Sequence, residues 1–201
     1  MSKSFDSRVI IGVAAAFILW YFVFLTDFFV SFWFRVTLAS IALTLYAYSG
    51  SNRLPIIKPD QKEIVQGIAS GIILYVLFYV GFNIFRPLVE GGALNVYTIR
   101  EETSLILSAM LLLITSFCEE YFWRGFAQRN IVASWGRNGV IVTSLLYAAI
   151  HISTLNMPLT AAALIAGLFW GILYEYSGSI WLVTFSHIVW TELIFVFLPL
   201  Q

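Results

Sequence analysis

The sequence predicts an all-α fold, a polytopic bundle of about seven to eight transmembrane helices that forms a single integral membrane domain over residues 1–201. Of the 201 residues, 60% are hydrophobic and only 11% are charged, and the mean hydropathy is +0.88. A typical soluble domain carries about 25% charged residues. A soluble fold of this size could not bury so much apolar surface, so the long apolar stretches are predicted to cross a membrane.

Seven apolar segments approach the length of roughly 20 residues that a membrane-spanning helix needs. They lie at about 9–26, 29–49, 64–85, 104–123, 139–153, 158–176 and 180–198. Only residues 26–28 separate the first two segments, so a tight antiparallel hairpin is expected there. Residues 86–102 are expected to form a loop, part of it at the membrane interface. Residues 127–138 are expected to form a short amphipathic helix on the membrane surface.

The distribution of basic residues predicts the orientation of these helices, because cytoplasmic segments are enriched in Lys and Arg. With a cytoplasmic N-terminus, eight of the eleven basic residues lie on that side. Arg86 and Arg100 lie on the other side, and Arg35 is left inside the second span. An odd number of spans then puts the C-terminus outside. The eight cytoplasmic residues are Lys3, Arg8, Arg53, Lys58, Lys62, Arg124, Arg129 and Arg137.

The N-terminal segment and the charge of the chain narrow its location and partners. The first apolar segment lacks a small-residue cleavage site, so it is expected to be retained as a span rather than cleaved as a signal peptide. Membrane lipid is therefore an expected partner. The formal net charge of +0 argues against a nucleic-acid partner.

Ionisable residues inside predicted spans are candidate functional residues, because they are costly to place in lipid. In the fourth span, Glu120 and Arg124 are four residues apart and are expected to pair on one helix face. Glu119 lies about 100° further round the helix and points elsewhere. A carboxylate in a dry site without a close cation is a plausible proton acceptor. The alternative is that both glutamates pair with Arg124 or Arg35 and only hold helices together.

The chain has two histidines, and both follow the glutamate pair in later spans. His151 lies four residues after Tyr147, whose ring can pack against the imidazole. His187 lies four residues before Thr191, whose hydroxyl can form a hydrogen bond near the imidazole. A lone buried histidine is usually a satisfied core residue. Two of them in spans that follow two glutamates favour one shared site.

Other residues in the spans have ordinary structural interpretations. Cys118 is expected to be a small buried hydrophobic residue. Gly167 and Gly171 form a G-x-x-x-G pattern, which allows close helix packing and would help to draw the fifth and seventh spans together. Aromatic residues near the span ends are expected to anchor the helices at the membrane interface. They are Trp20, Trp181 and Tyr176.

Three short motifs occur in a fixed order on three spans: "EEYFWR" at 119–124, "YAAIH" at 147–151 and "HIVWT" at 187–191. Together they resemble the Glu-Glu-x-x-x-Arg, Phe-x-x-x-His and His-x-x-x-Asn/Asp motifs of the CPBP family. This family includes CAAX prenyl endoproteases and the bacteriocin-processing Abi proteins. Tyrosine stands at the usual Phe position, and threonine stands at the usual Asn or Asp position.

The resemblance covers roughly residues 106–195 and implies a division of the domain. Residues 1–103 would supply the N-terminal spans and loops, and residues 104–198 would form a four-helix catalytic core. It also implies an intramembrane endopeptidase of the glutamate type that needs no cofactor.

The resemblance implies roles for the motif residues. Glu119 would activate a water molecule, and His151 would help to hold it. His187 and Thr191 would stabilise the oxyanion, although a threonine hydroxyl reaches less far than the usual asparagine. Glu120 and Arg124 would support the site as a buried pair.

The expected partner is a peptide or protein substrate, cut near its C-terminus or in its membrane-proximal part. Prenylated CAAX-like tails, leader peptides of bacteriocins or signalling peptides, and C-terminal sorting tails of surface proteins are the candidates. The small chain and the lack of a prenyl-specific signal favour a processing enzyme of a prokaryotic inner or plasma membrane.

Other readings stay open. Glu119, His151 and His187 could bind zinc and leave one position for water. A thiol mechanism could pair Cys118 with His151. In another class of function, the protein could be a non-catalytic immunity or scaffold protein or a small transporter. A transporter would be expected to show broken helices or inverted repeats.

The predicted spans raise one difficulty for a shared site. Glu119 would lie near the cytoplasmic end of its span, and His151 near the far end of the next, about 10 Å apart in depth. The two can meet only if the segment after Arg124 enters the membrane or if the fifth span begins deeper.

Overall fold

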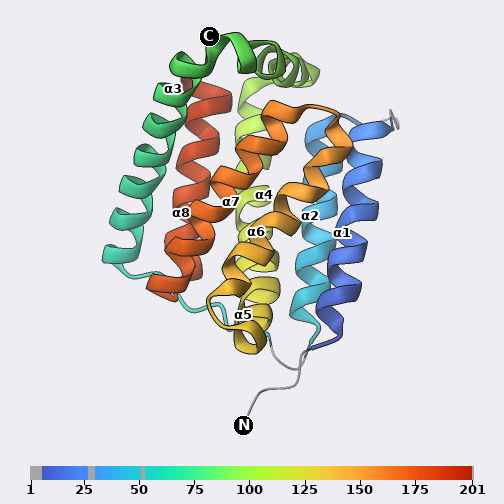
Figure 1. Cartoon of the computed structure of the whole chain (residues 1–201), viewed down its shortest axis with the longest axis vertical. Coiled ribbons are helices and arrows are strands. Elements are labelled where there is room, and N and C mark those ends of the chain that lie inside the picture. Colours follow the sequence, from blue (N-terminus) through green and yellow to red (C-terminus); the bar gives the residue numbers. More distant parts are fainter. Residues whose placement is uncertain (1–5, 27–29, 51–52, 201) are drawn as a thin grey trace.

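The computed structural model describes residues 6–26, 30–50 and 53–200, and all regular secondary structure in these ranges is helical. The helices form one bundle, in which α1 begins at the lower end and α8 finishes at the upper end (Figure 1). The helices are α1 (Arg8–Leu25), α2 (Phe32–Tyr48), α3 (Gln61–Thr98), α4 (Leu105–Glu120), α5 (Arg129–Trp135), α6 (Asn138–Ile150), α7 (Met157–Ser177) and α8 (Ile180–Thr191).

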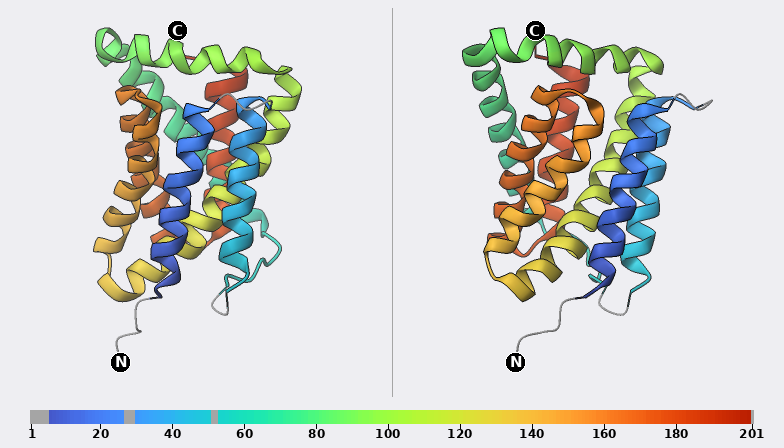
Figure 2. Two further views of the ribbon diagram at one scale, coloured as in Figure 1. Left: turned by 90° about the vertical axis from the view of Figure 1, so that its right-hand side faces the viewer. Right: turned by 45° about the vertical axis from the view of Figure 1, so that its right-hand side comes forward.

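Four short segments extend these helices: η1 (Ile99–Glu102), η2 (Tyr121–Gln128), η3 (His151–Thr154) and η4 (Glu192–Phe197). Within the described residues, five helical stretches are long and apolar enough to cross a membrane, and α2 and α6 are shorter apolar helices. The protein is therefore a polytopic membrane helical bundle, as the composition predicts. Helices α1 and α2 lie side by side and antiparallel in both views (Figure 2). Of the expected hairpin turn, residues 27 and 28 lie outside the described ranges.

Local sequence signals fix several helix ends. Asp60 and Glu63 form a capping box at the start of α3, in which each side chain accepts a hydrogen bond from the other's backbone N–H. Asn156 and Ser179 cap α7 and α8 through their side-chain oxygens. Gly178 ends α7 in the left-handed conformation, with φ of +65°, which glycine adopts without strain.

Residues 86–102 are helical, so the expectation of a loop there is wrong. Helix α3 is kinked at Phe85, two residues before Pro87, which cannot donate a hydrogen bond to the preceding turn. After the kink, α3 and η1 lie across the upper end of the bundle (Figure 2). We call residues 86–102 the roof segment.

Hydrogen bonds with three other helical segments hold the roof segment in place. Trp33 of α2 donates its indole N–H to the carbonyl of Ile99 at 3.1 Å. Asn156, at the start of α7, donates to the carbonyl of Gly92 at 2.8 Å. Arg100 of the roof segment donates to the carbonyl of Val196 in η4 at 2.8 Å. The roof segment therefore closes one end of the bundle.

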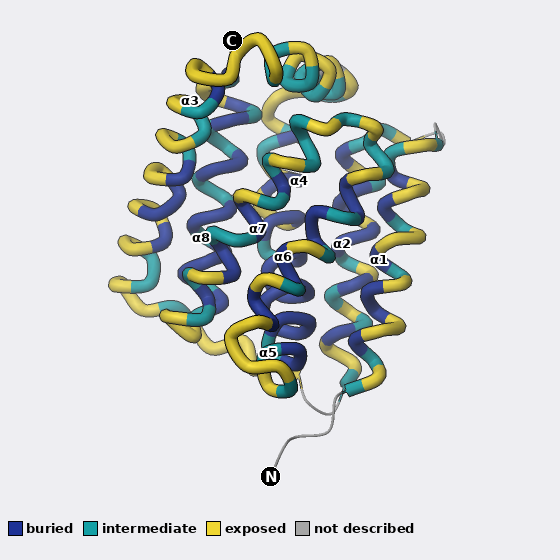
Figure 3. The backbone as a smooth tube through the Cα atoms, viewed as in Figure 1, coloured by how far each residue is buried: buried dark blue, intermediate teal, exposed yellow. Residues whose placement is uncertain are grey.

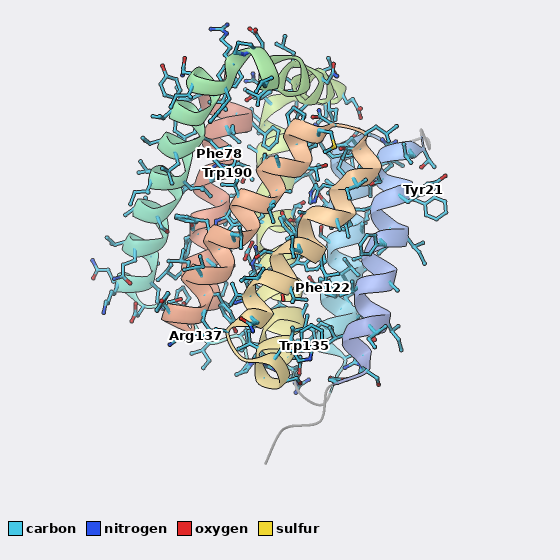
Figure 4. The ribbon with its side chains drawn as sticks, viewed as in Figure 1. Tyr21, Phe78, Phe122, Trp135, Arg137 and Trp190 are labelled. Carbon is cyan, nitrogen blue, oxygen red and sulfur yellow. The ribbon has the colours of Figure 1, made fainter. Side chains whose placement is uncertain are left out.

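The segment after Arg124 is not a separate surface helix, which corrects a second expectation. Helix α4 continues through the π-helical η2 into α5, so that 105–135 is one helical stretch. Every residue of η2 is buried, and so are Asn130 and Ile131. The stretch turns only after Trp135, near Arg137 at the lower end of the bundle (Figure 4). A π-helical turn inside an α-helix is frequent at functional sites.

Close helix contacts depend on two G-x-x-x-G patterns. A Cβ on Gly167 would lie 3.0 Å from the ring of Tyr147, and one on Gly171 would lie 3.0 Å from Val140, so α7 packs tightly on α6 as predicted. The second pattern, Gly67 and Gly71 in α3, was not singled out in the sequence. It packs against the backbone of α8, where added Cβ atoms would lie 2.7 and 2.6 Å from carbonyl oxygens.

Candidate active site

The two adjacent glutamates make different contacts at the end of α4. Glu120 is fully buried, and its Oε1 accepts hydrogen bonds from Arg124 at 3.0 Å and from His187 Nδ1 at 2.8 Å. The predicted Glu120–Arg124 pair is therefore confirmed. Glu119 turns away, and its Oε2 accepts a hydrogen bond from the Tyr147 hydroxyl at 2.8 Å. The two carboxylates thus have separate partners.

Arg124 is buried between helices and is not exposed at an end of the bundle, as a basic residue that flanks a span would be. It is 1% exposed, and its NH2 donates to the carbonyl of Gly167 at 3.0 Å. Its guanidinium lies 5.0 Å from the ring centre of Tyr147 and 5.5 Å from that of Trp170, distances typical of cation–π contacts. Arg35 lies in the first turn of α2 rather than deep in a span, and it donates to the carbonyl of Val30.

His151 is held at the end of α6. Its Nδ1 lies 2.8 Å from the carbonyl oxygen of Tyr147. A carbonyl can only accept, so Nδ1 carries the hydrogen and Nε2 is left with its lone pair. The rings of Tyr147 and His151 pack edge to face at 5.0 Å, as the motif predicts. Trp20 lies 6.3 Å from the imidazole and is 1% exposed, so it is part of this site and not an interface anchor.

His187 has two close contacts that orient its ring. One is the hydrogen bond from Nδ1 to Glu120, and the other is a stack on Trp170, with ring centres 3.8 Å apart and planes at 20°. Trp170 is fully buried and donates to Ser186 at 3.3 Å. Trp170 belongs to none of the three motifs, so it could not be singled out from the sequence.

The Thr191 hydroxyl is engaged within its own helix. It donates to the backbone carbonyl of His187 at 2.9 Å, one turn earlier, and lies 3.3 Å from the hydroxyl of Ser116. A hydroxyl has one hydrogen to donate. Thr191 could therefore contact an oxyanion only by giving up this helix bond, and its expected donor role stays a prediction.

Side chains from α1, α2, α3, α4, α6, α7 and α8 meet at a cavity of about 120 Å³. Glu119, His151, His187 and Thr191 all line it. Its other walls are mostly aromatic and aliphatic and include Trp20, Trp33, Trp170 and Trp190. The cavity has room for several water molecules in a mostly apolar surround. The structure therefore brings the residues of all three motifs together.

The expected difference in depth disappears because α4 is longer than predicted. Glu119 lies sixteen residues before Trp135, and His151 lies thirteen residues after Asn138, on either side of the same turn. At 1.5 Å per residue the two lie within roughly 5 Å of one another in depth. The first of the two expected arrangements is therefore the one observed: the segment after Arg124 lies inside the bundle, as a continuation of the fourth helix.

The zinc alternative stays a prediction, whereas the thiol alternative can be compared with the position of Cys118. Among the residues that the structure describes, no group of three His, Cys, Asp or Glu side chains is arranged to hold a metal ion. Cys118 is buried and is not among the residues that line the cavity. It lies instead towards α2, where Thr44 donates to its backbone carbonyl.

A second, larger cavity of about 380 Å³ adjoins the first. It lies between the kinked part of α3, the start of α7 and the end of α8, where Phe78 packs on Trp190 with ring centres 5.0 Å apart (Figure 4). No charged residue in the described part of the chain lines it. The two cavities share walls formed by Val96, Leu159, Ala162, Trp190 and Phe195.

The fold and the site define a class: a polytopic membrane protein with a cavity that is lined by a carboxylate and two imidazoles. Residues 101–192 match the family model described as type II CAAX prenyl endopeptidase Rce1-like, and the match contains all three motifs. This part of the chain is therefore similar to the CAAX-type intramembrane endopeptidase family, which confirms the resemblance. No curated protein and no solved structure matches the chain.

Proposed function

We propose that the protein is an intramembrane endopeptidase of the glutamate type, with Glu119, His151 and His187 as its catalytic residues. The observation that carries this proposal is that these three side chains, from three helices, line one small cavity. Peptide hydrolysis needs a base, a water molecule held near it, and a donor for the developing oxyanion.

In the proposed mechanism, Glu119 takes a proton from a water molecule as its oxygen attacks the carbonyl carbon of the scissile peptide bond. The lone pair on Nε2 of His151 accepts a hydrogen bond from the water's other O–H group, which orients the water. As the tetrahedral intermediate collapses, the carbon–nitrogen bond breaks. Glu119 then returns its proton to the leaving nitrogen, so that protons balance over the cycle.

His187 is proposed to act as an imidazolium, which donates from Nδ1 to Glu120 and from Nε2 to the oxyanion. The carboxylate on one side and the face of Trp170 on the other are contacts that an imidazole makes favourably when it is positively charged. Glu120 and Arg124 are proposed to support this ring without contacting substrate. One donor of this kind contributes about 3 kcal/mol in other hydrolases.

The substrate is proposed to be a peptide with an apolar portion next to the scissile bond, such as a lipidated C-terminal tail or a sorting tail. The apolar second cavity supports this, because it shares walls with the first and has room for a hydrocarbon group. A cytoplasmic N-terminus and a prokaryotic membrane are part of the proposal. The basic residues outside the bundle core support that orientation.

The proposal is tested by Glu119→Gln in purified protein in lipid vesicles. The probes are an internally quenched peptide that ends in a farnesylated C-a-a-X tail and the same peptide without the lipid. We expect kcat to fall at least about 100-fold, because the base is lost. Glu90→Gln is the control, since Glu90 is an exposed glutamate on α3. Cleavage by Glu119→Gln at the normal rate would instead favour a non-catalytic role for Glu119.

The zinc alternative is tested in the same assay. Cleavage that resists a strong chelator, by protein without stoichiometric metal, supports the glutamate mechanism. Loss of cleavage on chelation and its return with zinc would support metal binding by Glu119, His151 and His187.

A further inference from the structure

Tyr147 stands where the matched motif usually has phenylalanine, and its hydroxyl makes a contact that phenylalanine could not make. The hydroxyl donates to Oε2 of Glu119 at 2.8 Å, between α6 and α4. The same residue's backbone carbonyl accepts the hydrogen bond from Nδ1 of His151, also at 2.8 Å. One residue therefore contacts both side chains that are proposed to hold the attacking water.

The ring of Tyr147 is confined on several sides, so its hydroxyl has a fixed position. Trp123 packs edge to face against it at 5.4 Å, and the guanidinium of Arg124 lies 5.0 Å from its ring centre. Gly167 completes the enclosure, because a Cβ there would lie 3.0 Å from the ring. The residue is 5% exposed. A side chain locked by its packing can hold a neighbour in one geometry.

We propose that Tyr147 is a positioning residue for the hydrolytic site, an inference that rests on the proposed function. Its hydroxyl holds one oxygen of Glu119 and leaves the other oxygen for the water. Its backbone carbonyl accepts the hydrogen bond from Nδ1 of His151 and so orients the imidazole towards the same water. The distance and angle between base and water are thus set by a single side chain and its own backbone. A misplacement of about 1 Å can cost about 100-fold in rate.

The test is Tyr147→Phe, which keeps the ring and the carbonyl and removes only the hydroxyl. With the farnesylated quenched peptide as probe, we expect kcat to fall roughly 10- to 100-fold while KM stays within about twofold. The matched control is Tyr121→Phe. Tyr121 is 1% exposed, and its hydroxyl also makes a 2.8 Å hydrogen bond, but to the carbonyl of Leu54 outside the cavity. Both kinetic constants of this control should stay within about twofold.

A second measurement separates positioning from a general loss of structure. Glu119→Asp shortens the side chain and withdraws the carboxylate from the tyrosine. In that background, Tyr147→Phe should lower kcat by less than about threefold, because the contact is already broken. Equal losses in both backgrounds would overturn the inference. So would a kcat for Tyr147→Phe equal to that of the unsubstituted protein.

The two levels of the proposal fail in different ways. Full activity of Tyr147→Phe, together with loss of activity in Glu119→Gln, overturns the positioning role and leaves the endopeptidase mechanism standing. Full activity of Glu119→Gln overturns the mechanism, and the positioning role with it. Gly167→Ala is a third variant. Its added methyl group should displace the ring of Tyr147 and, like Tyr147→Phe, lower kcat.

Discussion

The stretch α4–α5 and helix α3 both have the length and apolarity of membrane spans, but they lie in different surroundings. In α4–α5 and in α8 with η4, 56% of the most apolar window is buried inside the protein, against 17% in α3 (Figure 3). The enclosed helices carry Glu119, Glu120 and His187, whereas α3 has no charged residue between Ile64 and Phe85. Ionisable groups in a membrane are stable where neighbouring helices supply polar partners for them. The lipid around an outer helix offers no such partners.

Each region has one Arg–Glu pair with the same four-residue spacing, which makes the comparison testable. Arg86 and Glu90, beyond the kink of α3, pair at 2.8 Å with their side chains 48% and 42% exposed. Glu120 and Arg124 pair at 3.0 Å and are 0% and 1% exposed. Sequence spacing and distance are nearly equal, and the opposite order of the two residues matters by only about 0.5 kcal/mol, so a larger difference in energy comes from the surroundings.

The largest predicted effect is the loss of stability on breaking the buried pair. Arg124→Met should lower the free energy of unfolding by about 3–5 kcal/mol, because Glu120 would be left as a buried charge with only His187 as partner. Arg86→Met should cost less than about 1 kcal/mol, since water screens the exposed pair. Unfolding in mixed detergent micelles, followed by tryptophan fluorescence, measures both. Equal costs would mean that the surroundings do not decide the strength of these pairs.

A smaller effect is predicted where α3 meets α8. Gly71→Ala should lower the free energy of unfolding by about 1–3 kcal/mol, because the new Cβ would lie 2.6 Å from the carbonyl oxygen of Ser186 and 2.8 Å from Val189. Gly81→Ala, ten residues later in the same helix, is the control, since no atom lies within 4 Å of its added Cβ. The same unfolding assay compares them. A neutral Gly71→Ala would show that α3 can move away from α8 at little cost.

The sequence predicted the fold class and the contacts within single helices, but not the path of the helices around the site. The i, i+4 spacing of Glu120 and Arg124 and of Tyr147 and His151 is a local property of a helix, so these contacts could be read directly. The shared site of Glu119 and the two histidines was predicted from the order of the motifs along the chain. The depth of these residues in the membrane could not predict it, because the hydropathy pattern ended the fourth span at about residue 123.

The errors have a common physical cause. The polar residues after Arg124 look like a surface helix in sequence, but the side-chain amides of Gln128 and Asn130 donate to carbonyls inside the bundle. The roof segment looks like a loop because Pro87 and two glycines interrupt it, yet partners from other helices hold it as a helix. Such long-range partners leave no trace in local hydropathy. For the same reason Trp170, which stacks on His187 from α7, could not be found.

The smallest predicted effect concerns Thr191. This residue lies on the enclosed helix α8, and its hydroxyl donates to the backbone of its own helix. Thr191→Val keeps the shape of the side chain and removes the hydroxyl. We expect kcat on the quenched peptide to change by less than about threefold, or about 0.6 kcal/mol, because the hydroxyl hydrogen is bonded to the carbonyl of His187. A loss of tenfold or more would show that the hydroxyl turns to the oxyanion during the reaction. Thr191 would then do the work of the usual asparagine, and the oxyanion would have two donors instead of His187 alone.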